Sequence, residues 1–221
     1  MRTEQPQSRL IRGYDQDEKE PCCVAIIPAR GGSRRIPGKN LRPFRGKPII
    51  EHSIAKAFNS GLFAKVFVTT DHYPTACLAA HVGASVIHRP KELAADDVGT
   101  QQVAQHAMGQ ICRTWKIPAV WACVIYPTAP LMSVQSLKYG RACIDMLGLD
   151  YAIGVGTEPL ADAGQFYWGT KEAFLQDKPL YDVRTAMVPI AADRVCDINT
   201  EDDWKRAEQM YDNLIMKGIE A

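Results

Sequence analysis

The chain has 221 residues, of which 46% are hydrophobic and 23% charged, so it is long enough to bury a core within one globular domain. Its 26 Lys and Arg residues nearly balance its 25 Asp and Glu residues, which argues against nucleic acid or a membrane surface as a partner. The seven cysteines show neither zinc-site nor redox-motif spacing, which favours reduced thiols and a cytoplasmic protein.

The predicted elements begin after residue 21. Residues 1–21 are polar, so we predict a flexible N-terminal extension and not a signal peptide. Short apolar runs rich in β-branched residues predict buried strands at residues 22–28, 65–70, 84–87, 120–125 and 151–155. We predict a helix that has Pro48 at its first position, and further helices over residues 74–82 and 99–113. No run approaches the roughly eighteen apolar residues of a membrane helix.

The helix at the end of the chain carries the clearest signals. Thr200 and Asp203 predict a capping box at its start, and Gly218 predicts its end. The predicted buried faces are Trp204, Ala207, Tyr211, Leu214 and Ile215 for this helix, and Ile50, Ile54, Ala57 and Phe58 for the helix at Pro48. The alternation of strands and helices predicts one α/β domain over residues 22–221, with a mainly parallel, Rossmann-like sheet flanked by helices.

Residues 28–40, with the sequence PARGGSRRIPGKN, form a basic glycine loop directly after the first predicted strand. Ligands of an open parallel sheet bind beyond the carboxyl ends of its strands, so the loop lies where a nucleotide would bind. Glycines let backbone approach phosphate closely, and cationic side chains can neutralise a triphosphate. The residues of these two kinds are Arg30, Gly31, Gly32, Arg34, Arg35 and Lys39. A surface turn with solvated basic side chains is the alternative.

Two other nucleotide-binding motifs do not fit this loop. A P-loop would need Gly at position 33 and Ser or Thr at position 40, where the chain has Ser33 and Asn40. The Gly-x-Gly-x-x-Gly pattern of dinucleotide-binding proteins is also missing, which argues against a nicotinamide cofactor.

Five motifs in this order resemble the acylneuraminate cytidylyltransferases, enzymes that make CMP-activated nine-carbon sugar acids. The motifs are the loop at residues 28–40, TTD at 69–71, RPKELA at 89–94, YPTAPL at 126–131 and DINT at 197–200. Residues 162–169, DAGQFYWG, are most similar to the branch that activates pseudaminic acid, a sialic-acid-like sugar of bacterial surface glycans. The resemblance covers nearly everything after residue 22 and implies a fold like that of the nucleotide-diphospho-sugar transferases.

The resemblance implies that the anomeric hydroxyl of a nonulosonic acid attacks the α-phosphate of CTP and releases pyrophosphate. Catalysis would then rest on positioning and charge neutralisation, without a covalent intermediate. The implied catalytic residues are Lys39, Asn40 and Asp197. The implied nucleotide-binding residues are Arg30, Gly31, Gly32, Ser33, Arg34, Lys39, Asn40, Arg89 and Thr100, the last two at the cytosine end. For Arg89 alone, a surface salt bridge is the alternative.

The resemblance also implies Mg2+, held in this family by an Asp-x-Asp pair. Here the pair is Asp197 and Asn199, which point to the same side of an extended segment. The asparagine offers a neutral oxygen, so Asp197 would be the main protein ligand. A turn before the helix cap at Thr200 is the alternative.

Sugar contacts are expected from residues 165–168. Gln165 and Tyr167 are one strand period apart and would face the sugar together, whereas Phe166 and Trp168 would face the core. Asp71, directly after a predicted strand, would either support the active site or cap the following helix.

The chain departs from the family between Tyr151 and Asp162, where relatives place several dozen more residues. That portion contributes to the family's dimer arm and sugar contacts. With a shortened middle near residues 151–162, a homodimer of this chain would have a reduced interface. The expected partners are CTP and a nine-carbon sugar acid. The alternatives are a catalytically weak or inactive nucleotide-binding relative, and a cytidylyltransferase for another sugar acid, such as an eight-carbon one.

Overall fold

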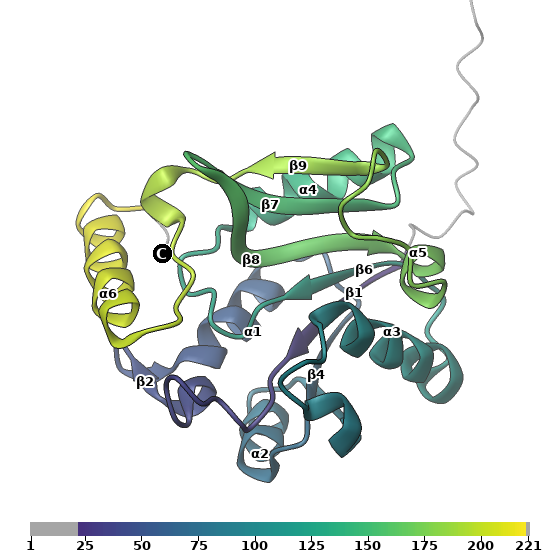
Figure 1. Ribbon diagram of the computed structural model, residues 1–221, viewed down its shortest axis with the longest axis horizontal. Coiled ribbons are helices and arrows are strands. Elements are labelled where there is room, and N and C mark those ends of the chain that lie inside the picture. The colour runs from purple at the N-terminus through teal and green to yellow at the C-terminus, as the bar shows by residue number, and fades with distance from the viewer. Residues whose placement is uncertain (1–21, 220–221) are drawn as a thin grey trace, which may run out of the picture.

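The structure is a computed structural model that describes residues 22–219, so the extension predicted at residues 1–21 lies outside the described residues (Figure 1). Within this range, seven strands form one sheet in the order β5-β4-β1-β6-β8-β7-β9. Their bounds are β1 Cys22–Pro28, β4 Lys65–Thr70, β5 Ser85–His88, β6 Ala119–Ile125, β7 Tyr151–Thr157, β8 Leu160–Thr170 and β9 Thr185–Pro189. Only β8 runs antiparallel to its neighbours. The mainly parallel α/β fold is therefore confirmed.

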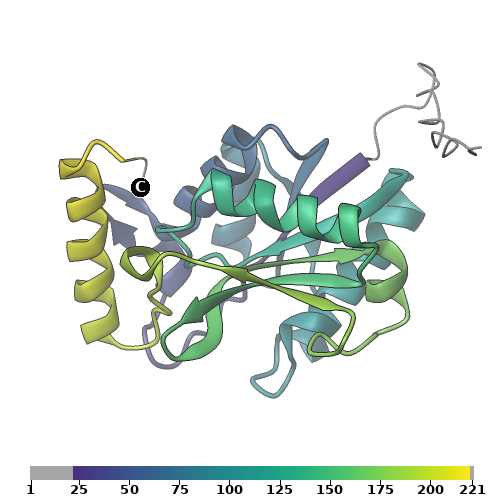
Figure 2. The ribbon, with the colours of Figure 1, turned by 90° about the horizontal axis from the view of Figure 1, so that it is seen from above.

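Helices cover both faces of this sheet. One face packs against α1 Ile49–Asn59, α2 Tyr73–His81 and α4 Val134–Leu147, and the other against α3 Thr100–Gln110 and α5 Lys171–Leu175. A small hairpin of β2 Pro43–Phe44 and β3 Lys47–Pro48 packs against α6 Glu201–Met216. Figure 2 shows α6 at one end of the molecule, with its axis across the direction of the strands. The short helical turns are η1 Lys39–Leu41, η2 Lys91–Ala94, η3 Ile111–Trp115 and η4 Ala192–Arg194.

All five predicted strands are present, with ends that differ from the prediction by at most two residues. The apolar run of β1 forms a central strand because residues 24–27 are fully buried between the two helical layers. The predicted capping box of α6 is also confirmed, since Thr200 and Asp203 exchange hydrogen bonds between side chain and backbone. All seven cysteines are free thiols, as expected.

Three predictions about helices are wrong in detail. Pro48 is extended, with ψ 135°, and pairs with Pro43 in the small hairpin, so α1 begins at Ile49. Ile215 and Phe58 are 54% and 45% exposed. Because α6 packs at the end of the molecule and not against the sheet, its buried stripe is narrower than its apolar content predicts.

Strand register brings four segments together at the carboxyl edge of the sheet. Pro28 at the end of β1 is level with Thr69 in β4, and Ile125 at the end of β6 is level with Phe166 in β8. The glycine loop, residues 71–72, residues 126–128 and residues 162–165 therefore lie at one edge. No helix within residues 22–219 has the length and apolar character needed to cross a membrane.

Candidate active site

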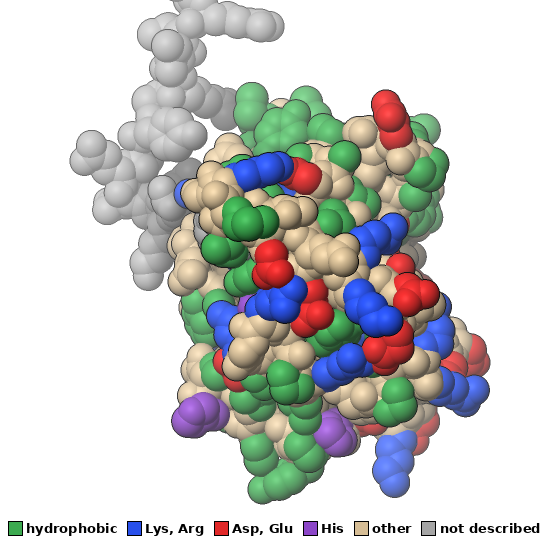
Figure 3. Space-filling view, turned by 90° about the vertical axis from the view of Figure 1, so that its left-hand side faces the viewer, with side chains coloured by type: hydrophobic (Ala, Val, Ile, Leu, Met, Phe, Trp, Pro, Cys, Tyr) green, Lys and Arg blue, Asp and Glu red, His purple; other side chains and the backbone are tan. Residues whose placement is uncertain are grey.

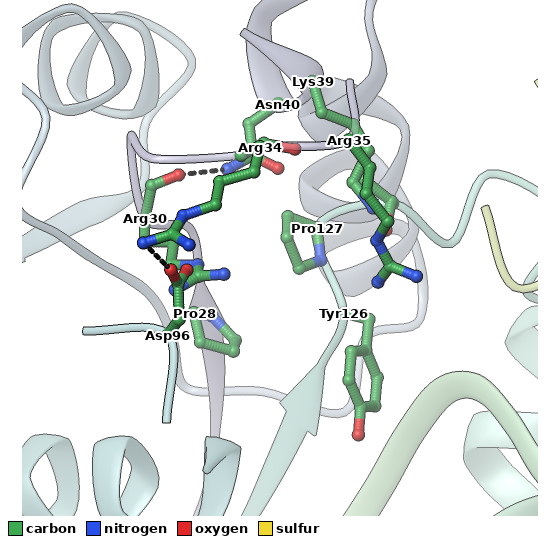
Figure 4. A pocket seen from close by; sticks show the side chains of 11 residues that line it. Pro28, Arg30, Arg34, Arg35, Lys39, Asn40, Asp96, Tyr126 and Pro127 are labelled. Carbon is green, nitrogen blue, oxygen red and sulfur yellow. Dashed lines mark hydrogen bonds and ion pairs between the residues drawn. The ribbon is translucent and has the colours of Figure 1, made fainter. Parts of the chain in front are cut away.

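A cavity of about 400 Å3 lies at this edge, between the glycine loop and the turn after β6 (Figure 4). We call it the loop cavity. Its lining residues are Pro28, Arg30, Ser33, Arg34, Arg35, Lys39, Asn40, Asp96, Tyr126, Pro127 and Thr128. The structure thus brings the predicted phosphate-binding side chains together around one space.

The backbone of the glycine loop is fixed by two side chains. The Gly31 N–H donates to Oδ1 of Asp71 at 3.0 Å, and Nδ2 of Asn40 donates to the Arg30 carbonyl at 2.9 Å. A Cβ at position 31 would lie 2.9 Å from Cβ of His72, so only glycine fits there. Of the two roles considered for Asp71, the structure therefore shows support of the loop, and His72 is the N-cap of α2.

Two arginines of the loop cavity share one carboxylate. Nη1 of Arg30 lies 2.7 Å from Oδ1 of Asp96, and Nη2 of Arg34 lies 2.5 Å from Oδ2 of the same residue. Arg30 also donates to the carbonyls of Ala94 and Ala95 at 3.4 and 3.2 Å. Asp96 thus pairs with both guanidinium groups that are predicted to bind the triphosphate.

Lys39 joins the glycine loop to the segment before α6. Its Nζ donates to the Ile198 carbonyl at 2.6 Å. Burial lowers the pKa of Lys39 from its ordinary value, and the nearby Asp197 carboxylate opposes this shift. A half-buried ammonium in the lining of the loop cavity therefore lies beside the proposed metal ligand.

Asp197 and Asn199 form part of a polar chain that starts in the loop. Nη2 of Arg35 donates to Oδ1 of Asn199 at 2.7 Å, and Nδ2 of Asn199 donates to Oδ2 of Asp197 at 2.5 Å. The Asn199 amide thus turns a donor toward Asp197, and its oxygen faces Arg35. Among residues 22–219, no group of three or more His, Cys, Asp and Glu side chains could hold a metal. A cation here would need phosphate oxygens from a ligand in addition to Asp197.

Arg89 and Thr100, predicted at the cytosine end, lie outside the lining of the loop cavity. Arg89 is buried, and its Nη2 donates to the Thr69 carbonyl at 2.9 Å. Burial lowers the pKa of Arg89 to about 10, and Asp71 opposes this shift. Arg89 is thus no surface salt bridge, the alternative considered for it alone. Thr100 begins α3, with its Oγ1 3.4 Å from the Tyr167 hydroxyl.

Gln165 and Tyr167, the predicted sugar contacts, lie inside the protein. Nε2 of Gln165 donates to the Arg194 carbonyl at 2.6 Å, and its Oε1 is buried without a hydrogen-bond partner among the described residues. Tyr167 is fully buried in the core beneath α3 and α5. The predicted alternation is confirmed, because Phe166 and Trp168 pack in the opposite core. Neither predicted sugar residue is in the lining of the loop cavity.

A second cavity of about 500 Å3 adjoins the hairpin of β7 and β8, and we call it the hairpin cavity. Its lining residues are Gly156, Thr157, Glu158, Pro159, Ala161, Asp162, Ala192, Val195, Cys196, Asp197 and Arg206. Oδ2 of Asp162 accepts a hydrogen bond from the Tyr126 hydroxyl at 3.4 Å, and Oδ1 accepts one from the Gly164 N–H at 2.8 Å. Burial raises the pKa of Asp162 despite these bonds. Since Tyr126 lines the loop cavity, the two cavities are neighbours.

Four residues of the two cavities were not predicted from the sequence: Asp96, Tyr126, Asp162 and Arg206. Tyr126 and Asp162 are the first residues of motifs already singled out, so their position was a usable signal. Asp96 follows the RPKELA motif by two residues, and only a fold that returns it to the glycine loop reveals its partners. Arg206 is an ordinary helix residue in sequence, and nothing marked it.

Figure 3, which views the end of the molecule, shows Lys and Arg side chains interspersed with Asp and Glu across the middle of this face. This face therefore carries both charges and is not uniformly basic. A family model for cytidylyltransferases matches residues 24–138, more than half of the chain. The chain belongs to the cytidylyltransferase family. It is therefore an enzyme of the nucleotidyltransferase class, and the resemblance stated from the five motifs is confirmed.

Among relatives of this cytidylyltransferase, the pseudaminic acid cytidylyltransferase of Campylobacter jejuni is 30% identical over 222 aligned positions, which cover 85% of this chain and 95% of that enzyme. The CMP-N,N'-diacetyllegionaminic acid synthase of Legionella pneumophila is 25% identical over 225 positions, covering 86% and 96%. In the first alignment, 85% of 221 residues is about 188, so about 34 of the 222 positions have no residue in this chain. The total fits the predicted shortening, whose place near residues 151–162 stays a prediction.

Solved structures show the same fold. A CMP:2-keto-3-deoxy-manno-octonic acid synthetase in complex with CTP superposes with a TM-score of 0.71 at 16% identity, covering 87% of this chain and 99% of that one. Rv0371c of Mycobacterium tuberculosis, in complex with manganese, gives a TM-score of 0.61 at 16% identity, with coverage of 85% and 98%. At these identities the likeness establishes architecture alone.

Proposed function

We propose that the protein transfers CMP from CTP to the anomeric hydroxyl of a nonulosonic acid, with pseudaminic acid as the preferred substrate, and releases pyrophosphate. The observation that carries this proposal is the loop cavity, where cationic side chains from one loop converge beside Asp197. The relatives named for pseudaminic and legionaminic acid support the substrate class. The hydroxyl oxygen forms the new bond to the α-phosphorus while the bond to the pyrophosphate oxygen breaks.

The residues of the loop cavity divide this work by position. Arg30, Ser33 and Arg34 hold the β- and γ-phosphates, which leave as pyrophosphate. Lys39 and Asn40 lie deeper and act at the α-phosphate, where the Lys39 ammonium stabilises charge that grows during transfer. Arg89 and Thr100 act at the cytosine end, and Gln165 and Tyr167 shape the sugar side from within. These roles account for charged and amide side chains at the carboxyl edge of the sheet.

The proposed cofactor is Mg2+, and the residues present fit it in part. Asp197 supplies a carboxylate next to the phosphate site, and the triphosphate supplies further oxygens, which is how proteins usually hold Mg2+. Asn199 fits only if its amide turns, because its NH2 group now faces Asp197. When bound, the cation would neutralise phosphate charge and lower the barrier to attack.

The comparison of Asn199→Asp with the wild type tests whether the pair Asp197 and Asn199 limits catalytic activity through weak metal binding. A second carboxylate beside Asp197 repels it until a cation binds, so we expect the variant to reach half-maximal activity at an Mg2+ concentration about tenfold lower. Pyrophosphate release is measured over a magnesium series. An identical magnesium response in both proteins would remove the metal pair as the limiting feature.

Substrate choice is tested by pyrophosphate release with a panel of substrates. We expect CTP to exceed UTP, ATP and GTP as donor, and pseudaminic acid to exceed legionaminic acid, N-acetylneuraminic acid and an eight-carbon ketosonic acid as acceptor. Preference for the eight-carbon acid would favour the alternative function, a cytidylyltransferase for another sugar acid. CTP binding without release from any acid would identify a nucleotide-binding relative.

We further propose a cytoplasmic enzyme, since CTP is a cytoplasmic metabolite, that forms a homodimer with a reduced interface. Sedimentation equilibrium over a concentration series measures the mass of the assembly. A monomer at micromolar concentration would overturn the dimer without affecting the chemistry proposed above.

A further inference from the structure

The hairpin cavity has an unusual charge pattern for a space beside a phosphate site. Three of its lining side chains are acidic, namely Glu158, Asp162 and Asp197, and one is cationic, Arg206. We propose that this cavity holds the acid acceptor and that Arg206 binds the acceptor's carboxylate. This inference rests on the proposed function, and it names the cavity and the residue that select an acid.

The position of the hairpin cavity suits the second substrate. It shares a boundary with the loop cavity at two places: the Tyr126 hydroxyl is 3.4 Å from Oδ2 of Asp162, and the segment that carries Asp197 is held by Lys39 through Ile198. A molecule in the hairpin cavity therefore lies next to the α-phosphate position. Its volume of about 500 Å3 is within the range of small-molecule sites and is large enough for a nine-carbon sugar.

Arg206 is placed to receive an anion. It lies on α6, its side chain is 59% exposed, and its contact with Oδ1 of Asp203 is long, at 3.5 Å. The other oxygen of Asp203 accepts hydrogen bonds from Asn199 N, Thr200 N and Thr200 Oγ1, at 3.1, 2.9 and 2.8 Å. Asp203 is thus held by the capping box independently of Arg206. The planar guanidinium group keeps donors for a carboxylate, which it binds through two parallel hydrogen bonds.

The neighbouring cations are engaged elsewhere. Lys39 donates to the Ile198 carbonyl, and Arg35 donates to Asn199. Arg194 is buried, and its Nη1 donates to the Leu131 carbonyl at 2.8 Å. Among the described residues that line the hairpin cavity, Arg206 is therefore the one cationic side chain that could bind the carboxylate of a ligand.

The chemistry of the acceptor agrees with this placement. In a ulosonic acid, the carboxylate and the reacting hydroxyl are attached to the same anomeric carbon. The Arg206 guanidinium lies beside the Cys196 thiol, and Cys196 precedes Asp197 in the chain. A carboxylate bound by Arg206 therefore brings the hydroxyl close to Asp197, and the acidic side chains Asp162 and Glu158 discourage the reverse orientation.

The test compares Arg206→Met with Lys205→Met, a control that removes an exposed cation from the same helix outside the cavity. Binding of pseudaminic acid and of its methyl ester is measured by calorimetry in the presence of CTP without divalent cation, and the KM values for acid and CTP by pyrophosphate release. We expect Arg206→Met to weaken acid binding and to raise the acid KM about 10- to 100-fold, with the KM for CTP unchanged. Lys205→Met should stay within twofold of the wild type. Arg206→Lys should recover part of the loss.

The ester distinguishes carboxylate recognition from a structural effect of the substitution. We expect the ester to bind the wild type as weakly as the acid binds Arg206→Met, and to bind both proteins alike. Equal acid binding by wild type and Arg206→Met would overturn the inference. The inference would also fail if the substitution Arg206→Met weakened binding of the ester as much as it weakened binding of the acid. If the wild type binds pseudaminic acid through Arg206 but releases no pyrophosphate with any acid, the proposed function fails and the acceptor site stands. If it releases pyrophosphate and Arg206→Met is unchanged, only the acceptor site fails.

Discussion

Asp96 bridges Arg30 and Arg34 in the lining of the loop cavity, and the proposed function assigns these two arginines to the β- and γ-phosphates of CTP. The nucleotide has to displace this carboxylate, because each guanidinium group now faces it. Asp96 therefore competes with the substrate for the same donors, and its removal should favour nucleotide binding.

We expect Asp96→Asn to bind CTP about three- to tenfold more tightly than the wild type, since each exposed ion pair contributes up to about 1 kcal/mol. The difference should shrink as salt is added, because screening weakens the bridge and the phosphate contacts together. Calorimetric titration with CTP at two ionic strengths measures it. Asp97→Asn, which removes the same charge one residue away, is the control. Weaker CTP binding by Asp96→Asn would show that the bridge positions the arginines for the nucleotide.

The glycine loop was predictable at the residue scale because its donors are neighbours in sequence. Asp96 was not predictable, because its partner Arg30 lies far away along the chain. Arg206 was not predictable, because the cavity that it lines exists only in the folded chain. The alternation of Gln165 and Tyr167 with Phe166 and Trp168 was predictable, whereas a contact with the sugar stays a prediction. Tyr167 is buried with residues of α3 and α5, and Gln165 is bonded to the Arg194 carbonyl of η4; no local sequence pattern contains these contacts.

At the scale of elements, α6 and the small hairpin β2-β3 are held together by an aromatic cluster around His52 of α1. The His52 ring makes edge contacts with Phe44 and Tyr211 at centroid distances of 5.4 Å, and its Nε2–H donates to the Phe44 carbonyl at 2.9 Å. Since α6 follows directly on the Asp197–Thr200 segment, this cluster helps to place Asp197, the proposed metal ligand.

Burial lowers the pKa of His52 below its ordinary value of 6.5. At pH values between the pKa of His52 in the folded protein and 6.5, the unfolded chain binds more protons than the folded protein does. The free energy of unfolding therefore rises with pH in this range and decreases as the pH falls. Urea unfolding at pH 7.5 and 5.5 measures this loss. His52→Gln should be less stable than the wild type. Its free energy of unfolding should also depend less on pH, with a slope smaller by up to about 1.4 kcal/mol per pH unit. Exposed His81→Gln is the control, and equal sensitivity in wild type and His52→Gln would contradict this account.

The strands were predicted more accurately than the ends of the fold. A buried parallel strand is a continuous apolar run, as in residues 24–27, and such a run is readable locally. The boundary of α1 was misplaced because Pro48 suits both a first helical turn and an edge strand, and only its pairing with Pro43 decides between them. The buried stripe of α6 was overestimated for a similar reason: its partner is a small hairpin and not the sheet.

At the scale of the whole molecule, two cavities meet at the carboxyl edge of one sheet, and we propose the first of them as the nucleotide site. The alternation of apolar runs and helices predicted a mainly parallel sheet, and the order of motifs predicted the class of enzyme. Neither pattern could predict the hairpin cavity, which is assembled from β7, β8, η4 and α6. The acceptor side of the reaction is therefore the part of the account that depends most on the structure.

The most direct test of the central claim is 31P NMR of the protein with CTP, Mg2+ and pseudaminic acid, beside Lys39→Met under the same conditions. We expect equal amounts of pyrophosphate and a CMP-linked sugar acid, formed at least about 100-fold faster by the wild type, because Lys39 is proposed to stabilise charge at the α-phosphate. CTP that binds to the wild type but stays intact, or is consumed no faster than by Lys39→Met, would contradict this expectation.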